Sequence, residues 1–511
     1  MSRIFKKIIK NTFIISLGTL ASRILGFFRD ILIANFFGTS FLIEAFLVAF
    51  RLPNIFRSLL GEGAVDSVVI PVISEYKEKD FIRVCSHLIT TCCFLLSIVV
   101  VLGIVFAKYI VVLTAPGFLL SPEKFELTVR LTRIVFSYLL FIGLSANLGG
   151  ILYTRGNFFV PSFSPLLLNL TVILGICLLS VFKEEPIYTL SYFVILAGLL
   201  QFLWNFLASR RYFNLTFNLK KALLDKATLK MGKLSLPRIW SVAIYHINVF
   251  LDTFLASFSN IVGEGAVAGI YYSNRLIQFP LALFSLSISR AVLPQLSNLS
   301  AEEKFEEFNS TLSFSLKNLS FFMIPFSLFF LFFSSPLIEV IFKRGVFDSY
   351  SVNITSSALF FYSLGLFFFS SSRLLISAFY SLKDTKTPAK ISTFVLLINF
   401  ILSIILMRPL KIGGLAFASS ISSTVGFLFL LKVLEKRIGV IKGLGVSWLK
   451  LTGISIISVG IGKVYFVLSE FALLPKIVLT MGIIMVIFFI LCSLGKIEPL
   501  PRIGRWIFGG K

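Results

Sequence analysis

The sequence predicts an all-α, polytopic membrane protein with about fourteen transmembrane helices. We expect two parallel-repeat six-helix lobes plus two C-terminal helices, arranged around a central cationic cavity. Of the 511 residues, 57% are hydrophobic and only 14% are charged, whereas soluble domains average about 45–50% apolar and about 25% charged residues. Apolar runs of about 20 residues, the length that spans a bilayer, recur from end to end. The composition therefore excludes a soluble globular protein.

The predicted spans group into two sets of six and a final pair. A basic link at residues 210–233 separates the sets, so we predict an N-lobe at 1–209, a basic cytoplasmic connector at 210–233, a C-lobe at 234–434 and a C-terminal region at 435–511. The spans are 11–37, 40–73, 84–108, 128–153, 160–182, 188–209, 236–257, 266–296, 312–341, 355–380, 387–407, 413–432, 446–468 and 474–494.

The second half of the chain repeats the first at an offset of about 223 to 230 residues. VVIPVIS at 68–74 matches AVLPQLS at 291–297, and Asn169 answers Asn399. Six spans per repeat is an even number, so both halves have the same orientation in the membrane. Parallel repeats of this kind place a transporter's substrate site between the two halves.

The charge distribution sets the orientation. The net charge is +24, and most Lys and Arg residues lie in alternate links, as the positive-inside rule expects for cytoplasmic loops. Both termini are then predicted to be cytoplasmic. Membrane topology explains the positive charge, and the sequence has no polar domain that carries a basic stripe with interleaved aromatic residues. We therefore predict no nucleic-acid partner.

The sequence carries no motif for catalysis. It lacks a phosphate-binding GxxxxGK[ST] loop, since Gly462-Lys463 is followed by Val464, and it has no HExxH or GxSxG motif. We therefore predict that the protein is not an enzyme and that it needs no cofactor, nucleotide or catalytic metal. Without ATP, transport would have to be driven by the membrane potential or by a coupling ion.

Arginines inside the first two predicted spans are the main functional signal. Each would cost roughly 2.5–3.5 kcal/mol if it faced lipid near the middle of a helix, so we expect a polar interior that receives them. Guanidinium groups stay charged and suit phosphate. The alternative is that they extend to the interface or pair with nearby carboxylates. The candidates for substrate binding are Arg23, Arg29, Arg51, Arg57 and, at the repeat position of Arg51, Arg275; the candidate supporting or gating acids are Asp30, Glu44 and Glu62.

Two further features suggest motion and coupling. Proline and glycine interrupt the second span and its repeat, at Pro53 and Pro280 among others, which indicates either a static kink or a hinge for alternating access. Asp252 lies within a predicted span, and such a carboxylate is a candidate functional site. It could bind Na⁺ or a proton, or merely pair with Arg238 or a neighbouring amide.

These residues resemble the MviN/MurJ family of lipid II flippases, within the multidrug/oligosaccharidyl-lipid/polysaccharide exporter superfamily. The matching motifs extend over nearly the whole chain in family order. They are SRILGFFRD at 22–30, EAFLVAFRLPN at 44–54, Arg57, EGA at 62–64, APGF at 115–118, YYSNRL at 271–276 with Pro280, RG at 344–345 and DTKTP at 384–388.

The resemblance implies transport of lipid II, an undecaprenyl-diphosphate-linked disaccharide peptide, from the inner to the outer leaflet of the bacterial cytoplasmic membrane. It implies a substrate site at the arginines named above, with the three acids in support, although Glu44 replaces the family's more usual aspartate. It also implies a groove for the lipid tail at the last two helices and links Asp252 to Na⁺ in some members. Membrane lipids, and cell-wall synthesis or division proteins, are the other expected partners.

Two other functions compete with this one. The first is export of another anionic polyprenyl-linked oligosaccharide, or cation-coupled drug antiport, on the same fold. A cationic drug would favour carboxylates over arginines, which disfavours drug export. The second is a scaffold for cell-wall synthesis enzymes that transports nothing, for which buried arginines would be costly and without use.

Overall fold

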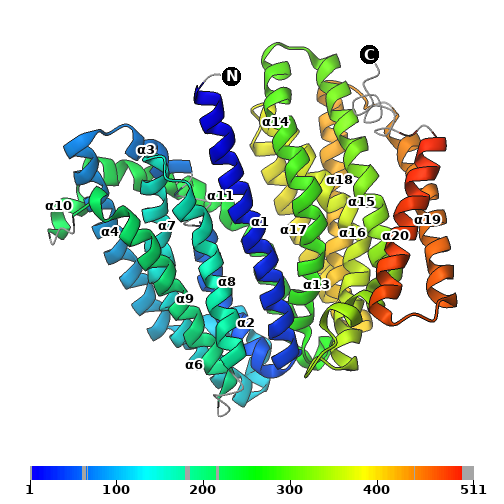
Figure 1. Cartoon of the computed structure of the whole chain (residues 1–511), viewed down its shortest axis with the longest axis horizontal. Coiled ribbons are helices and arrows are strands. Elements are labelled where there is room, and N and C mark those ends of the chain that lie inside the picture. The colour runs from blue at the N-terminus through cyan, green and yellow to red at the C-terminus, as the bar shows by residue number, and fades with distance from the viewer. Residues whose placement is uncertain are drawn as a thin grey trace. The chain divides into compact units, whose positions relative to one another are not determined.

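The structure is a computed structural model that describes residues 3–59, 65, 67–178, 185–214, 218–441, 443–495 and 497, with side chains for all of these except 3–8 and 236–245. Every regular element in this part of the chain is a helix (Figure 1). By contacts the chain divides into two compact units, Met1–Ser259 and Asn260–Lys511, and each is described here by itself. The predicted all-α class is confirmed.

The first unit is built around α7, α8 and α9. α1 packs along α8, α8 packs on α9, and α9 packs on α7, while α2 lies against α6 and α7 (Figure 1). α11 contacts α3, α4 and α5. The elements are α1 Arg3–Phe37, α2 Phe41–Ser58, α3 Ile70–Ser74, α4 Glu78–Val105, α5 Ala107–Thr114, η2 Pro116–Leu120, α6 Pro122–Val135, α7 Tyr138–Thr154, α8 Phe159–Leu178, α9 Pro186–Ser209, η3 Arg210–Tyr212, α10 Leu219–Leu223 and α11 Lys226–Ala256.

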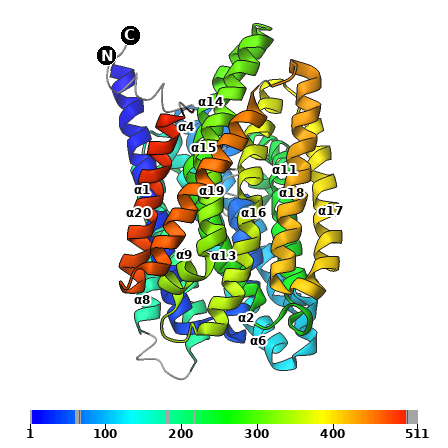
Figure 2. The same cartoon turned by 90° about the vertical axis from the view of Figure 1, so that its right-hand side faces the viewer.

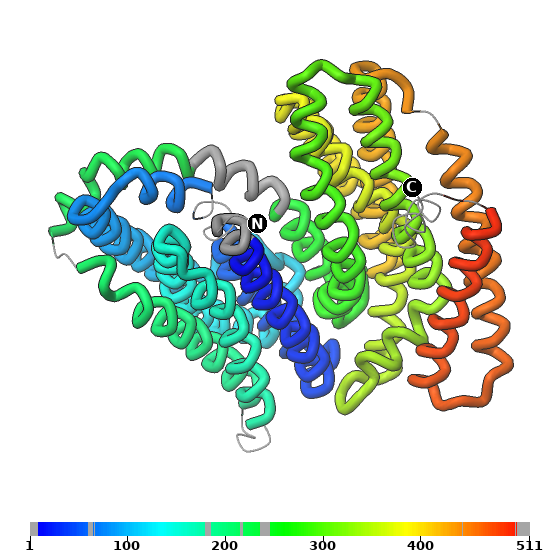
Figure 3. The backbone as a smooth tube through the Cα atoms, turned by 45° about the horizontal axis from the view of Figure 1, so that its top comes forward, coloured from blue at the N-terminus to red at the C-terminus, as the bar shows by residue number. Residues whose placement is uncertain are grey.

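The second unit is built around α16, which packs on α13, α15 and α18. α17 packs on α18, and the two run side by side in Figure 2. α19 and α20 form a hairpin that lies against α15, orange to red in Figure 3. The elements are α12 Ser259–Val262, α13 Ala266–Pro280, the π-helical turn η4 Leu281–Ser285, α14 Leu286–Ala301, α15 Phe305–Phe342, α16 Ser349–Ser381, α17 Lys386–Leu410, α18 Ile412–Ile438, α19 Leu444–Leu468 and α20 Leu473–Leu494.

Twelve helical segments in the described part of the chain are long and apolar enough to cross a membrane. The other two predicted spans also have helical counterparts. The described residues of the span predicted at 40–73 include α2 and α3, and the span predicted at 236–257 coincides with α11 up to the end of that helix at Ala256. α2 carries Glu44, Arg51 and Arg57 within its 18 residues, which makes it too highly charged to count as an ordinary apolar span.

In each unit, π-helical backbone directly follows a helix that contains a proline. π-helical residues follow α2 at Leu59, Val65 and 67–69, and another π-helical turn follows α13 at 281–285, directly after Pro280. π-helical turns inside α-helices occur frequently at functional sites. Their recurrence supports the predicted repeat. The boundary between the compact units falls after α11, while the lobe boundaries at 209, 233 and 434 were drawn from the sequence repeat and stay predictions.

Candidate substrate-binding site

Arg29 is held in place by two groups of the first unit. Its Nη2 and Nε donate to Oδ1 of Asp30 at 2.7 and 3.1 Å, and its Nη1 donates to Oδ1 of Asn169 on α8 at 3.1 Å. The Asn169 amide nitrogen in turn donates to the Ser22 carbonyl at 2.8 Å. The Asp30 side chain is 1% exposed and that of Arg29 is 12% exposed. The network joins α1 to α8 and fixes the direction of one guanidinium group.

Glu44 is paired with a lysine that the sequence did not single out. Its carboxylate forms an ion pair with Lys124 on α6, and both side chains are buried. The Lys124 ammonium also lies 4.1 Å from the centre of the Phe118 ring. Buried charges are stable only when paired, so this pair fastens α2 to α6 and its charges compensate one another.

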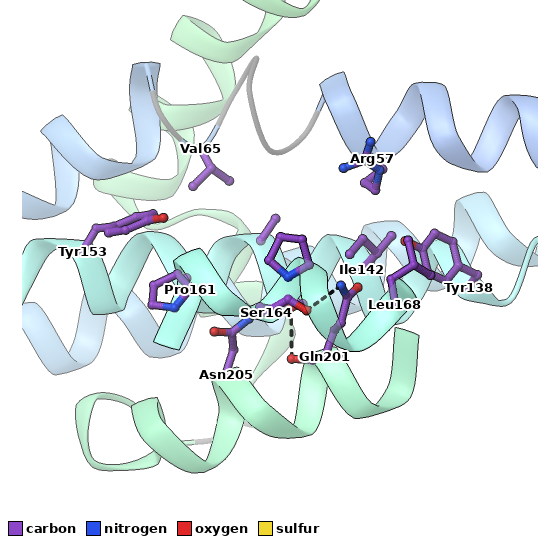
Figure 4. A pocket seen from close by; sticks show the side chains of 14 residues that line it. Arg57, Val65, Tyr138, Ile142, Tyr153, Pro161, Ser164, Leu168, Gln201 and Asn205 are labelled. Carbon is purple, nitrogen blue, oxygen red and sulfur yellow. Dashed lines mark hydrogen bonds between the residues drawn. The ribbon is translucent and has the colours of Figure 1, made fainter. Parts of the chain in front are cut away.

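Arg57 lies at a cavity of about 200 Å³ inside the first unit (Figure 4). Its Nε donates to Oδ1 of Asn54 at 3.1 Å. The two Nη groups of the guanidinium are the donors that a ligand could use. Figure 4 shows Arg57 on one side of the cavity and the polar groups of α8 and α9 on the other. The lining residues are Arg57, Val65, Tyr138, Ile142, Ser145, Ala146, Gly149, Tyr153, Pro161, Ser164, Pro165, Leu168, Gln201 and Asn205.

The other predicted arginines differ in their surroundings. Arg23 is exposed on α1, and Arg51 is half-buried on α2. Arg275 belongs to the second unit, where its Nη2 donates to the Tyr271 hydroxyl at 2.7 Å and its guanidinium lies 4.8 Å from the centre of that ring. The structure thus places four candidates in one unit and one in the other, and their convergence on one substrate stays a prediction. Glu62 lies outside the described residues.

Asp252 is buried in α11 at 9% exposure. Within the described residues, no group of three or more His, Cys, Asp or Glu side chains has the arrangement of a metal site. The predicted role of Asp252 in Na⁺ or proton coupling stays a prediction, and the Arg238 side chain is outside the described ones. At the last residue of α2, the Ser58 hydroxyl hydrogen-bonds to Nε2 of His246, which joins α2 to α11.

Sequence reasoning did not name the polar partners of this site. The sequence marks Asn169 only through the repeat, and it does not mark Lys124, Gln201 or Asn205 as functional residues. One signal was available for α9: Gln201 and Asn205 are four residues apart in an apolar span, which puts two amides on one helix face. No signal pointed to Lys124, since it lies in the charged stretch Pro122–Glu126, which resembles an exposed turn.

Comparison with known proteins places the chain among relatives of one kind. A profile of the lipid II flippase MurJ family matches residues 33–487. The chain is 34% identical over 431 residues to the probable lipid II flippase MurJ of Buchnera aphidicola subsp. Baizongia pistaciae, covering 84% of this chain and 83% of that protein. It is 31% identical over 426 residues to the lipid II flippase MurJ of Burkholderia cenocepacia, covering 82% of each.

Solved structures agree with the sequence comparison. A lipid II flippase MurJ in an inward closed conformation matches with a TM-score of 0.81 and 28% identity, over 94% of this chain and 98% of that one. An inward-facing multidrug resistance MATE family transporter of the MOP superfamily matches with a TM-score of 0.64 and 14% identity, over 82% and 95%. This second likeness shows a shared fold. From the profile, the relatives and the 0.81 match together, the chain belongs to the lipid II flippase MurJ family.

Proposed function

We propose that this protein moves lipid II from the inner to the outer leaflet of the bacterial cytoplasmic membrane by alternating access. Membership of the family supports the substrate. The observation that carries the proposal is the presence of two guanidinium groups on α1 and α2: Arg29, fixed by Asp30 and Asn169, and Arg57 beside a cavity with polar groups. Both lie within helices of a membrane protein, where unneeded arginines would be costly.

The physical task of such a protein is to replace water around a charged headgroup. Ionised groups moved into hydrocarbon without compensation would cost tens of kcal/mol in the idealised limit. Guanidinium forks bind phosphate oxygens in pairs, so arginines can compensate the diphosphate while the polyprenyl tail stays in lipid. The Asp30–Asn169 contacts prearrange Arg29, which reduces the entropy lost on binding.

Arg275 and Arg57 extend this proposal to both halves of the chain. If each unit supplies guanidinium groups to one diphosphate, binding of the substrate would favour the alternating-access movement of the two units. The π-helical residues after α2 and after α13 are suited to act as hinges, because in each unit they interrupt the regular hydrogen-bond ladder directly after a helix that contains a proline.

The positive charge of the arginines suggests that the membrane potential supplies the energy for transport. An unloaded cationic site responds to the membrane potential at about 2.3 kcal/mol per charge per 100 mV, so we propose that the potential, together with Na⁺ or H⁺ bound at Asp252, drives the cycle without any catalytic step. Both termini would lie in the cytoplasm. Dissipating the potential in cells is then expected to slow the appearance of lipid II outside, and unchanged export would contradict this coupling.

The test of the function is lipid II accessibility at the outer leaflet of cells. The protein is depleted and then supplied as wild type, Arg29→Ala or Arg275→Ala at matched membrane levels. Wild type is expected to restore outer-leaflet lipid II, and the two variants are expected to fail. Equal restoration by all three would show that the arginines are structural. If wild type restores nothing and cell-wall enzymes lose their location, the scaffold function replaces transport.

A further inference from the structure

Two lysines of the α19–α20 hairpin meet at one aromatic ring. The ammonium of Lys463 on α19 lies 5.6 Å from the centre of the Phe466 ring, and the ammonium of Lys476 on α20 lies 4.7 Å from the same centre. Lys463 comes five residues before the last residue of α19, and Lys476 is in the first turn of α20. At a rise of about 1.5 Å per residue, both lie within about 8 Å of the turn that joins the two helices.

Lys463 also contacts the kink in α15, and this contact uses only part of its hydrogen-bonding capacity. α15 departs from helical geometry at Phe333, and it contains Pro336. A proline has no N–H to donate to the carbonyl four residues earlier, which here is that of Phe332. Nζ of Lys463 donates to this carbonyl at 3.4 Å. A lysine ammonium has three N–H donors, so two of them remain for another partner.

The two positive charges have no acidic partner in the part of the chain that the structure describes. Neither Lys463 nor Lys476 forms an ion pair there, and Glu470, the nearest acid in the sequence, is exposed and forms none either. Like charges that lie close together repel, and a charged side chain within a membrane helix is costly unless a partner or water compensates it. An anion bound at this point would relieve the repulsion and accept from the ammonium groups.

The surface around the two lysines is apolar. The hairpin lies at the edge of the second unit, with α15 as its main neighbour (Figure 3). Six apolar side chains near the turn are more than half exposed: Val464, Val467, Leu468, Phe471, Leu474 and Val478. In a membrane protein, such side chains contact acyl chains. A ligand that suits this surface therefore carries an anionic group and acyl chains in one molecule.

We infer that the turn end of the α19–α20 hairpin binds the phosphate of an anionic bilayer phospholipid, whose acyl chains lie along the exposed residues of α19 and α20. The phosphate oxygens accept from Lys476 and from the two remaining donors of Lys463. The inference goes beyond the proposed function, because this lipid is not transported and its binding does not depend on lipid II. It is a headgroup site, distinct from the groove for a polyprenyl tail that the family resemblance implies for these helices.

The experiment labels the purified full-length protein in detergent with a phosphatidylglycerol that carries a photoreactive group beside its headgroup. Peptide mass spectrometry then measures the adducts within residues 463–476. A lysine near an anionic lipid is worth about 1 kcal/mol, so Lys476→Gln is expected to raise the concentration for half-maximal labelling about 5-fold, and Lys463→Gln with Lys476→Gln about 25-fold. Unlabelled phosphatidylglycerol is expected to displace the probe, and phosphatidylcholine, whose headgroup is neutral overall, is expected to displace it poorly.

Matched variants separate the possible failures. Lys450→Gln removes an exposed lysine at the other end of α19 and is expected to match wild type. Lys476→Arg keeps the charge and is expected to label as wild type does. Because Lys476 contacts only the Phe466 ring, its Gln variant tests the site without disturbing the contact to α15.

Three outcomes would overturn the inference. If the double variant labels at the wild-type concentration, the lysines only extend toward water and bind no lipid. If phosphatidylcholine displaces the probe as well as phosphatidylglycerol does, the apolar surface alone holds the lipid. If undecaprenyl phosphate displaces the probe at a concentration at least 10-fold lower than phosphatidylglycerol, the site belongs to the polyprenyl carrier. None of these outcomes bears on whether the protein transports lipid II, which the leaflet measurement above decides separately.

Discussion

Glu44 and Lys124 show what single residues must do in this fold. Each is charged, each is buried, and each is the other's ion-pair partner. Removal of one member leaves an uncompensated buried charge, which typically costs 3–5 kcal/mol, whereas removal of both is often tolerated. The pair thus has more effect on stability than a surface pair, whose median worth is about 0–1 kcal/mol.

Lys124→Met is therefore expected to lower the free energy of unfolding by about 3–5 kcal/mol. The double variant Glu44→Gln with Lys124→Met is expected to recover much of that loss. Arg83→Met is the matched control, since Arg83 pairs with Asp80 on the surface. Denaturant unfolding in detergent measures all three. A loss for Lys124→Met no larger than that of Arg83→Met would contradict the buried pair.

At the scale of elements, short connections fix how the helices pack. Gly117 in η2 approaches the end of α11 closely: its backbone N–H donates to the Ser257 hydroxyl at 3.0 Å. A Cβ at this position would lie 2.3 Å from the Ser257 carbonyl oxygen. The motif APGF, noted in the sequence as part of a family resemblance, is here the contact between η2 and α11.

Gly117→Ala is expected to destabilise the protein by about 1–3 kcal/mol, because backbone atoms must move to admit the methyl group. Gly232→Ala is the control. Gly232 lies in α11 with open space around it, so the same change there should be neutral or stabilising by about 0.5–1 kcal/mol. The midpoints of thermal unfolding of the two variants are compared. Equal midpoints would contradict the close contact at Gly117.

In the turn between α16 and α17, the Asp384 carboxylate connects two helix ends. Its carboxylate accepts the Thr387 backbone N–H at 2.9 Å and pairs with Arg437 of α18 at 2.7 Å. Hydrogen bonds from Thr387, followed by the charge and hydrogen bond of Arg437, lower the pKa of Asp384 from 3.8 to about 2. The ionised carboxylate thus caps α17 and fastens it to the end of α18.

A lowered pKa has a definite sign for stability. The contribution of Asp384 is fully present above pH 3.8 and is lost as the pH falls toward about 2. Hydrogen exchange of the α16–α17 turn should therefore quicken over this range in wild type. Asp384→Asn should exchange faster above pH 3.8 and show less change below it. An equal pH response in both proteins would assign the effect to other groups.

The scale of elements is also where sequence reasoning succeeded best. Apolar runs predicted the helices because membrane spans need about 20 apolar residues. The prolines and glycines of the second span and its repeat predicted a kink or a hinge there, but not the π-helical residues that follow α2 and α13. Sequence reasoning failed where tertiary contacts determine which side chains are buried and which of them meet. Lys124 sits among charges typical of a turn, yet packing buries it against Glu44. The cavity groups come from α7, α8 and α9, and their meeting depends on how those helices pack.

At the scale of the whole molecule, each of the two repeats has a broken helix and at least one arginine suited to an anionic lipid substrate. The first unit carries a prearranged Arg29, an Arg57 that lines a cavity, and a charge-compensated Glu44–Lys124 pair. The second carries Arg275 on Tyr271. Family membership supplies the substrate, and these contacts supply the groups that would bind it.

If the proposal is right, this chain alone moves lipid II by means of the guanidinium groups within its helices. The most direct measurement is lipid II translocation in liposomes that contain only the purified protein, with an imposed membrane potential. Wild type is expected to expose lipid II on the far leaflet, and Arg57→Ala is expected to abolish most of that transfer while folding normally. Equal transfer by wild type, Arg57→Ala and protein-free liposomes would contradict the account.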